Sequence, residues 1–464
     1  MDRTPDCFQW AQEHFGAADL GDPRRAKRLV ASAAAIAAQP EKSFPSVFDW
    51  NELRAFYNLC GRDEATLQAL QRPHWELTRA AMAREPLVLI VHDTTELDFT
   101  SHHALEGAGP IGDHRGKGFL QHNSLAFTPD GSRLLGLAYQ QVKVRQPTPE
   151  KETRKARKKR ARESQRWMEG IQASGTPPEG ATWVDVGDRG ADVYEAMEEA
   201  SAVGHHFLFR ACQNRVVFVG GAASGDGPDE EVYLMEHARS LAAQGDGAVE
   251  VPPGPGRPGR SARVKLAACA VRVPPPRTAA KRKQRPTLQA WVVRVWEPSP
   301  PEGVKALEWV LLCSVRTETL EQIKERQRWY AVRWSAEVYH DVEKNGCSEE
   351  DRRFETAGAM VSCLGVLAVV AVRVYQLRLA VKAAPDAPVQ QVATAEEIAV
   401  MEEHLGKKSL SVLQFVRGVA KLGGFLGRKG DGEPGIRALW RGYQRLQDMV
   451  AGFRLLSKRR HASP

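Results

Sequence analysis

The chain has 464 residues, of which 42% are hydrophobic and 26% charged, and it carries a formal net charge of +8. This length predicts two or three domains, and the apolar content is that of a globular protein. The positive charge favours a polyanionic partner. Seven scattered cysteines without a CxxC pair argue against a disulfide framework or a zinc module and favour a reducing cytoplasm.

No segment of the sequence predicts a signal peptide or a membrane span. The N-terminus, MDRTPDCFQWAQEHF, lacks the basic and apolar regions of a signal peptide. The longest uncharged apolar run, residues 357–372, is shorter than the roughly 20 residues that a membrane span needs. We therefore expect a buried helix there, in a soluble protein without a membrane partner.

Residues 1–80 are predicted to form a small helical domain. Ala, Leu and Glu are frequent and no alternating run interrupts them. Acidic and basic residues nearly balance in this part, so its overall charge does not indicate nucleic-acid binding. One local basic cluster does hint at it: Arg24, Arg25, Lys27 and Arg28.

From Leu87 onward the pattern changes to mixed α/β. The run LVLIVHD is typical of a strand buried on both faces, and two further strands flank the turn at 129–131. A basic helix, the strand TWVDVGD, a helix and the strand HHFLFRAC follow. The order predicts a central mixed sheet in a domain that spans residues 81–384.

Within this domain, residues 216–310 are rich in Gly and Pro and alternate like exposed antiparallel strands. We interpret them as a β-rich insertion. Helices resume near Thr319, and residues 385–464 are expected to form a separate helical unit.

Two basic segments stand out, residues 151–163 and residues 251–290, and the second contains no acidic residue. Such runs are usually solvated surface. They also suit contact with a phosphate backbone, which gives affinity but little sequence information. Their presence does not distinguish DNA from RNA.

Two aspartates are expected at strand ends, Asp93 after LVLIVH and Asp188 after WVDVG. Residues just past the carboxyl ends of strands line the ligand crevice of an α/β sheet. Two carboxylates there suit a shared Mg²⁺ or Mn²⁺ ion. Each alone is more often a turn or N-cap residue.

A polar stripe is predicted on the helix that contains YAVRWSAEVYHDVEK. Its members lie within an arc of about 80° on a helical wheel: Tyr330, Arg333, Glu337, Asp341 and Lys344. The opposite arc is apolar and is expected to face the core. Periodicity alone favours a salt-bridged solvent face, since Arg333 and Glu337 are four residues apart.

Taken together, Asp93, Asp188, Glu337 and the Tyr-x₂-Arg-x₃-Glu-x₆-Lys spacing resemble the bacterial DDE cut-and-paste transposases of the transposon-five type. The resemblance runs nearly the full length and includes WAQEHFGAADLGDPRRAKRLV, HDTTELDF, DRGADVY and LEWVLL. It is loosest across residues 216–300 and in the last sixty residues.

The resemblance implies an RNase H-like catalytic domain between a DNA-reading N-terminal domain and a dimerising C-terminal region. Asp93, Asp188 and Glu337 would bind two divalent metal ions, Mg²⁺ or in its place Mn²⁺. Tyr330, Arg333 and Lys344 would hold phosphates near the cut.

The resemblance also implies contacts elsewhere on double-stranded DNA. Trp309, in LEWVLL, matches an aromatic that stacks on a base flipped out of the duplex, although a strand tryptophan can equally be a core residue. Arg210 and Arg215 fall where the family has basic DNA contacts. Asp341 has no matched role and is expected to be a surface residue.

The expected activity is nicking, hairpin formation and opening at transposon ends, and strand transfer into target DNA, with the two ends held by a homodimer. Two other functions stay open from the sequence. One is a catalytically inactive, transposase-derived DNA-binding regulator. The other is a general RNase H-like nuclease that cuts duplexes without the end sequence.

Overall fold

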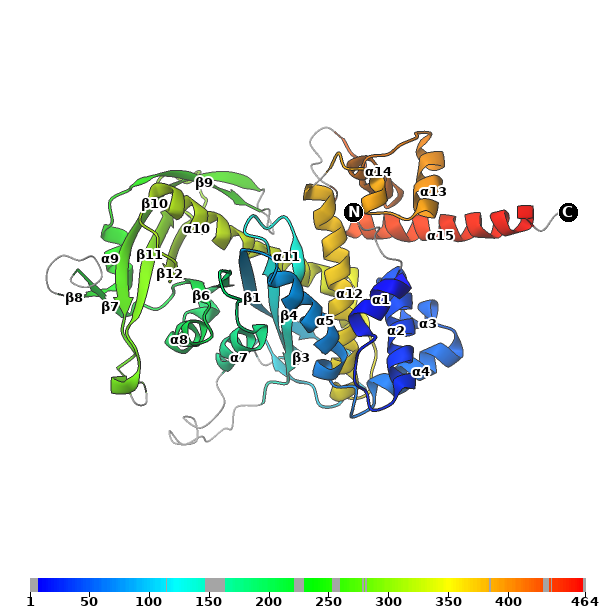
Figure 1. Cartoon of the computed structure of the whole chain (residues 1–464), viewed down its shortest axis with the longest axis horizontal. Helices are drawn as coiled ribbons and strands as arrows, with labels where there is room; N and C mark the ends of the chain where they lie inside the picture. Colours follow the sequence, from blue (N-terminus) through cyan, green and yellow to red (C-terminus); the bar gives the residue numbers. More distant parts are fainter. Residues whose placement is uncertain are drawn as a thin grey trace.

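The computed structural model describes residues 7–461 with gaps at 114, 147–162, 221–228, 253–258, 278, 280–281, 384, 429–433 and 435. Three parts follow one another along the chain: an N-terminal helical module, a large sheet with its helices, and a C-terminal group of helices (Figure 1). The basic segment 151–163 falls almost wholly in one of the gaps, so the helix expected there lies outside the described residues.

The N-terminal module is helical, as predicted, and side-chain caps explain where its helices begin. Asp22 and Thr66 each accept a hydrogen bond from the first turn of a helix, and Asp49 forms a capping box with Glu52. The helices are α1 (Cys7–Phe15), α2 (Pro23–Ala38), α3 (Phe44–Val47), α4 (Trp50–Cys60) and α5 (Leu67–Met82).

One mixed sheet of twelve strands forms the centre of the described part of the chain. Its order is β2-β3-β1-β5-β6-β12-β11-β10-β7-β8, with β4 paired to β3 and β9 paired to β10. The strands are β1 (Leu87–Asp98), β2 (Gly109–Ile111), β3 (Gly116–Phe127), β4 (Leu134–Lys143), β5 (Thr182–Gly187), β6 (His206–Arg210), β7 (Val216–Val219), β8 (Glu230–Tyr233), β9 (Gly245–Val251), β10 (Arg260–Val273), β11 (Leu288–Trp296) and β12 (Glu308–Cys313).

Strands β1, β5 and β6 run parallel to one another, whereas β1 and β3 are antiparallel. Helix α7 (Gln165–Ser174) leads from β4 into β5, and helix α8 (Tyr194–Ala202) lies in the connection from β5 to β6. The predicted insertion is indeed antiparallel, with strands β7–β12 and helix α9 (Leu234–Ser240). It extends the central sheet because β12 pairs with β6.

The apolar run at 357–372 lies in α12 (Ala357–Ala383), which passes between the sheet and the N-terminal module (Figure 1). One helix of the described chain, Ala357–Leu379, is long and apolar enough to cross a membrane, but 78% of its most apolar window is buried in the protein. Its side chains pack on α2, α4, α5 and β4. The expectation of a buried core helix is confirmed.

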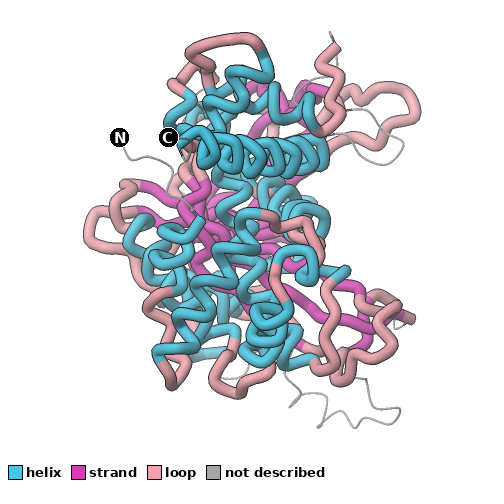
Figure 2. Tube along the Cα trace, turned by 90° about the vertical axis from the view of Figure 1, so that its right-hand side faces the viewer, coloured by secondary structure: helices cyan, strands magenta, loops and turns pink. Residues whose placement is uncertain are grey.

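The C-terminal helices have their own small core, which includes Met401, Phe415 and Leu446. They are α13 (Ala395–Leu405), α14 (Val412–Leu422) and α15 (Ile436–His461). Thr394 and Ser411 open the first two with capping boxes. Figure 2 shows α15 as a long helix lying across the molecule, above most of the sheet.

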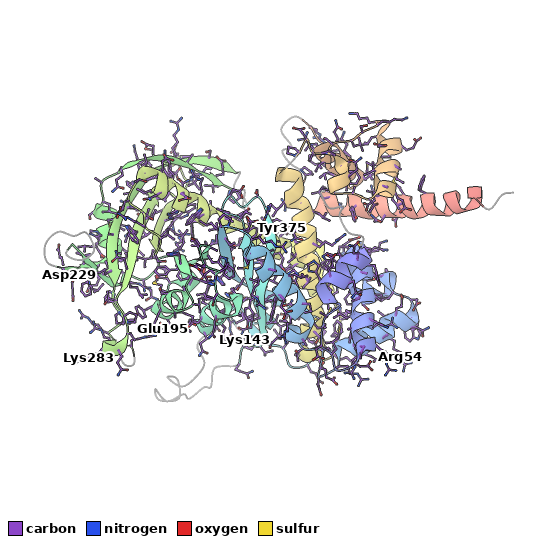
Figure 3. All side chains as sticks on the ribbon, in the orientation of Figure 1. Arg54, Lys143, Glu195, Asp229, Lys283 and Tyr375 are labelled. Atoms are coloured by element: carbon purple, nitrogen blue, oxygen red, sulfur yellow. The ribbon has the colours of Figure 1, made fainter. Side chains whose placement is uncertain are left out.

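Exposed basic side chains are found at both ends of the molecule (Figure 3). Arg54 on α4 and Lys283 in the insertion are exposed and lie at opposite ends (Figure 3). The predicted architecture, an RNase H-like mixed α/β domain with helical domains before and after it, is the one observed.

Candidate active site

Asp93 and Asp188 lie side by side at the same level of the sheet. Strand β1 pairs in parallel with β5 as far as His92 and Gly187. Asp93 directly follows His92, and Asp188 directly follows Gly187. Neighbouring strands are about 4.8 Å apart. Asp188 begins the short helix Arg189–Ala191, and its Oδ1 accepts a hydrogen bond of 2.7 Å from the Gly190 N–H.

The expectation that Asp93 ends its strand is wrong. Strand β1 continues to Asp98, because its other neighbour β3 is long and pairs with it as far as Gly118. Asp93 stands opposite Asn123 in that antiparallel ladder. Only the parallel pairing with β5 ends beside Asp93, and this is what leaves the two carboxylates together.

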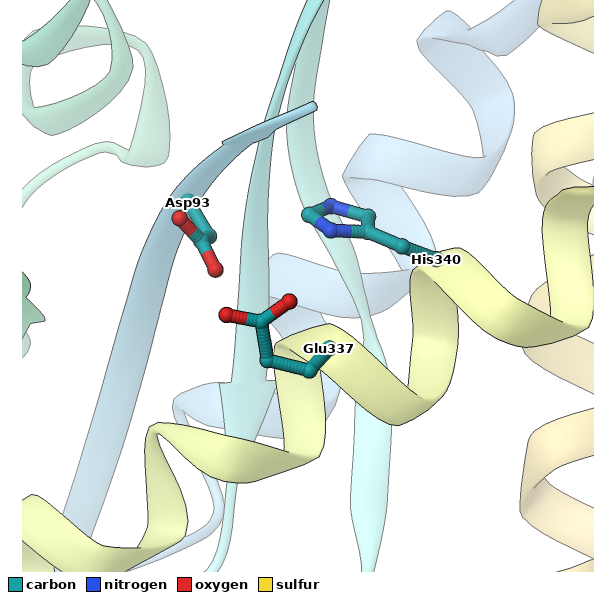
Figure 4. Close-up of side chains that lie close together, drawn as sticks. All are labelled: Asp93, Glu337 and His340. Atoms are coloured by element: carbon teal, nitrogen blue, oxygen red, sulfur yellow. The ribbon is translucent and has the colours of Figure 1, made fainter. Parts of the chain in front are cut away.

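Glu337 joins this pair from the helical segment that follows the insertion. Helix α10 (Leu320–Val332) ends at Arg333, α11 (Trp334–Asp341) begins immediately after it, and a π-helical turn (Val342–Gly346) follows. Figure 4 shows the Glu337 carboxylate directed toward Asp93 across the gap between helix and strand. Single π-helical turns are frequent at functional sites.

The helical arc predicted from the sequence is only partly correct. Arg333 and Glu337 face the strand, and Ala336, Tyr339 and Val342 are buried as expected. Tyr330, by contrast, is only 3% exposed, so it is a buried residue and not part of an open polar stripe. Asp341 accepts a 2.7 Å hydrogen bond from the Asn345 side chain and takes no part in the site.

Arg333 holds the two facing carboxylates together. Its Nη1 lies 3.2 Å from Asp93 Oδ2 and 3.4 Å from Glu337 Oε1. Burial raises the pKa of Asp93 to about 7, and the charges of Glu337 and Asp188 add to that rise, whereas Arg333 opposes it. Several acids compete for positive charge here, which is the electrostatic condition for binding a cation.

The donor set at this place fits a divalent metal ion. Asp93, Glu337 and His340 each offer one ligand atom, and these atoms all lie within 4.8 Å of one another. Asp188 is close enough for its charge to raise the pKa of Asp93. Carboxylate oxygens are the ligands that suit Mg²⁺ and Mn²⁺.

Trp309 and Tyr330 form one cluster beside the acids. Their rings meet edge to face, with centroids 4.9 Å apart. Arg210, on the neighbouring strand, donates to the Glu308 carbonyl at 2.9 Å, and its charge acts on Tyr330, whose pKa burial raises. The structure therefore brings these three predicted residues together.

Lys344 and Arg215 are engaged in bonds within the protein. Lys344 Nζ donates to the Glu96 carbonyl at 2.5 Å and lies 3.3 Å from Glu350. Arg215 forms an ion pair with the buried Asp192.

The basic cluster of the N-terminal module lies at the start of α2, apart from the acids. Arg24 pairs with Asp22 at 2.9 Å, and Arg25 pairs with Glu64 at 2.8 Å. Lys27 is exposed and Arg28 is half-buried.

Two residues near the site, His340 and Glu343, were not identified as candidates from the sequence. His340 lies one helical turn after Glu337, a spacing that could have indicated it. Glu343 is buried under the π-helical turn and accepts hydrogen bonds from Asn123 and Gln140 at 3.1 and 3.4 Å. Nothing in the local pattern distinguishes Glu343 from a surface glutamate.

A buried His–Asp–His network supports the strand that carries Asp93. Asp185 accepts from His92 at 2.8 Å and from His205 at 2.9 Å. Burial alone would raise the pKa of Asp185, but His205 and His92 outweigh it and hold the pKa at about 2. The network ties β5 to β1 at His92, one residue before Asp93.

We expect Asp185→Ala to lower the free energy of unfolding by roughly 3 kcal/mol, because it leaves two buried histidines without their acceptor. Urea unfolding at pH 7 measures the change. The matched control is Asp229→Ala, which removes a partly exposed ion pair with Arg272 and should cost less than about 1 kcal/mol. Equal effects of the two substitutions would contradict a supporting role for the network.

Both end segments of the chain match known protein families. A family described as "Transposase DNA-binding" matches residues 8–65, from the second residue of α1 through α4 and most of the loop that follows. A family described as "Transposase Tn5 dimerisation domain" matches residues 369–461, from the middle of α12 to the end of α15. The chain is a Tn5-type transposase. This transposase therefore carries a DNA-binding domain at its N-terminus and a dimerisation domain at its C-terminus, and the acidic site lies between them.

Proposed function

We propose that this transposase moves DNA by a cut-and-paste reaction, with metal-dependent phosphoryl transfer at Asp93, Asp188 and Glu337. The observation that carries the proposal is the position of these three carboxylates: Asp93 and Asp188 follow the last paired residues of β1 and β5, and a Glu337 oxygen lies within 4.8 Å of an Asp93 oxygen. They are separated by up to 244 positions along the chain, and all three lie between the segments that match a DNA-binding and a dimerisation family.

The three carboxylates are proposed to hold two Mg²⁺ ions, which Mn²⁺ could replace. When bound, such ions activate a water or a 3′-hydroxyl group and stabilise the departing oxygen in an in-line displacement. Asp93 contributes through its burial, since a carboxylate with few water contacts binds a cation more strongly than an exposed one. Asp188 and Glu337 supply the further negative charge.

The basic residues around the acids are proposed to hold the DNA phosphates. Arg333 already lies beside two of the carboxylates and is placed to neutralise charge on a phosphoryl group. Lys344 and the Tyr330 hydroxyl would make further phosphate contacts. The same site would nick the end, form and open a hairpin, and join the end to target DNA.

Arg24, Arg25, Lys27 and Arg28 are proposed to contact the transposon end, as part of the matched DNA-binding domain. Arg210 would contact DNA from within the Trp309 cluster. Arg215 would first have to exchange its Asp192 partner for a phosphate. In the end-paired dimer, each subunit would cut the end that its partner binds.

Trp309 is proposed to stack on a base that leaves the duplex during hairpin formation. We expect Trp309→Ala to nick normally but to form hairpins roughly tenfold more slowly, because stacking on an aromatic ring contributes about 1–3 kcal/mol per base. Gel analysis of nicked and hairpin products measures both steps. The control is Trp296→Ala, since Arg294 already covers that ring at 4.2 Å. Equal hairpin rates in the two variants would remove the proposed role.

The function is tested with the inverted repeats of the DNA that flanks the coding region. We expect the full chain to bind a duplex of that sequence and to cut it in Mg²⁺, but to leave a scrambled duplex intact. Binding without any cleavage would indicate a DNA-binding regulator. Equal cleavage of both duplexes would indicate a general nuclease.

A further inference from the structure

His340 is part of the acidic site by position, although neither the spacing of the acids nor the matched domains includes it. It lies on α11 three residues after Glu337, and its side chain is on the same side of the helix (Figure 4). One of its ring nitrogens lies within 4.8 Å of the carboxylate oxygens of both Asp93 and Glu337.

The imidazole of His340 is buried, and Nε2 has no hydrogen-bond partner among the described residues. The buried histidines of the supporting network differ from it. His92 and His205 each engage both ring nitrogens, with Asp185, Ser124 and the Gly175 carbonyl. A buried polar atom without a partner is uncommon in proteins and calls for an explanation.

The imidazole of His340 can act as a ligand through this nitrogen. A neutral imidazole carries a lone pair on one ring nitrogen, and histidine is the commonest metal-binding side chain.

We propose that His340 is a direct ligand of the metal ion held by Asp93 and Glu337, which makes this a mixed nitrogen and oxygen site. The proposal rests on the metal assignment made above and extends it. Mg²⁺ prefers oxygen ligands, whereas first-row transition metals also bind at sites that contain nitrogen ligands, with an affinity that increases from Mn²⁺ toward Cu²⁺. His340 therefore shifts the preference of the site toward Mn²⁺.

The test uses the full chain with Mn²⁺ as a spectroscopic probe. Electron spin-echo modulation detects a nitrogen bonded to Mn²⁺ without any measurement of DNA cleavage. We expect a ¹⁴N signal from the wild type, its conversion to a ¹⁵N signal after labelling with ¹⁵N-histidine, and its loss in His340→Ala. The exposed His103 provides the control variant His103→Ala, which should keep the signal.

Affinity gives the second readout. His340→Ala should weaken Mn²⁺ binding by about tenfold or more and weaken Mg²⁺ binding less. Loss of a residue that only hydrogen-bonds to a metal ligand already lowers metal affinity by about tenfold or more, and a direct ligand should matter at least as much. Asp93-dependent Mn²⁺ binding in the wild type without a nitrogen signal would overturn the role of His340 and leave the carboxylate site intact. Mn²⁺ binding that Asp93→Asn does not reduce would instead overturn the metal assignment itself.

Discussion

Asp93→Ala is expected to lower the rate of Mg²⁺-dependent cleavage of transposon-end DNA by at least roughly 10³-fold, as for other groups that act as one catalytic unit. Asp93 is the most buried of the three acids and faces Glu337 and Arg333 directly. Without it, the two remaining carboxylates cannot hold metal ions in position for the displacement. End binding, measured by gel shift, should stay unchanged because the matched DNA-binding domain lies elsewhere.

The control for this prediction is Asp98→Ala on the same strand. Asp98 is an exposed carboxylate at the end of β1, five residues after Asp93, and its side chain accepts a hydrogen bond from the Thr100 N–H. The control should cleave at nearly the wild-type rate. Undiminished cleavage by Asp93→Ala, measured under single-turnover conditions, would remove Asp93 from the catalytic site.

The second large effect is a change in stability, and here a substitution of Asp93 is expected to stabilise the folded protein. The pKa of Asp93 rises on folding from the 3.8 of a free aspartate side chain to about 7, because burial disfavours the charged carboxylate. A raised carboxyl pKa contributes stability that is fully present below pH 4 and is lost as the pH rises to 7. Above pH 7 the folded protein carries the charge at a cost of roughly 4 kcal/mol.

Asp93→Asn removes that cost because the amide stays neutral. In the absence of divalent ions, the variant should therefore be more stable than the wild type at pH 8, by up to roughly 4 kcal/mol, and nearly equal to it at pH 4. Urea unfolding at the two pH values in EDTA measures the difference. A variant less stable than the wild type at pH 8 would contradict the electrostatic description of the site. Added Mg²⁺ should stabilise the wild type and narrow the gap.

The arrangement of the acids was only partly predictable from the sequence. The buried run before Asp93 identified a central strand, and the similar run before Asp188 identified its parallel neighbour. The length of β1 was not visible, because it depends on the pairing with β3, a segment more than twenty residues away. Asp93 lies beside Asp188 because the parallel pairing of β1 with β5 ends at His92, although β1 itself continues.

The helix that carries Glu337 shows a second limit. A regular period of 100° per residue placed Tyr330 and Lys344 on the same arc as Glu337. The break at Arg333 and the π-helical turn after Asp341 change that period, and Trp309 buries Tyr330. These features arise from packing against distant strands, so local periodicity cannot reveal them. His340 was overlooked because a single histidine on a helix is a weak signal until the fold places it against two carboxylates.

The central claim, that Asp93, Asp188 and Glu337 bind divalent ions together, can be tested by mapping the ion directly. Fe²⁺ bound in place of Mg²⁺ produces radicals in ascorbate and peroxide that cut the polypeptide next to the ion. We predict cuts close to residues 93, 188 and 337 of the full chain, all suppressed by excess Mg²⁺ and absent in Asp93→Ala. Cuts confined to other segments, or cuts at these three positions that Mg²⁺ does not suppress, would contradict the claim.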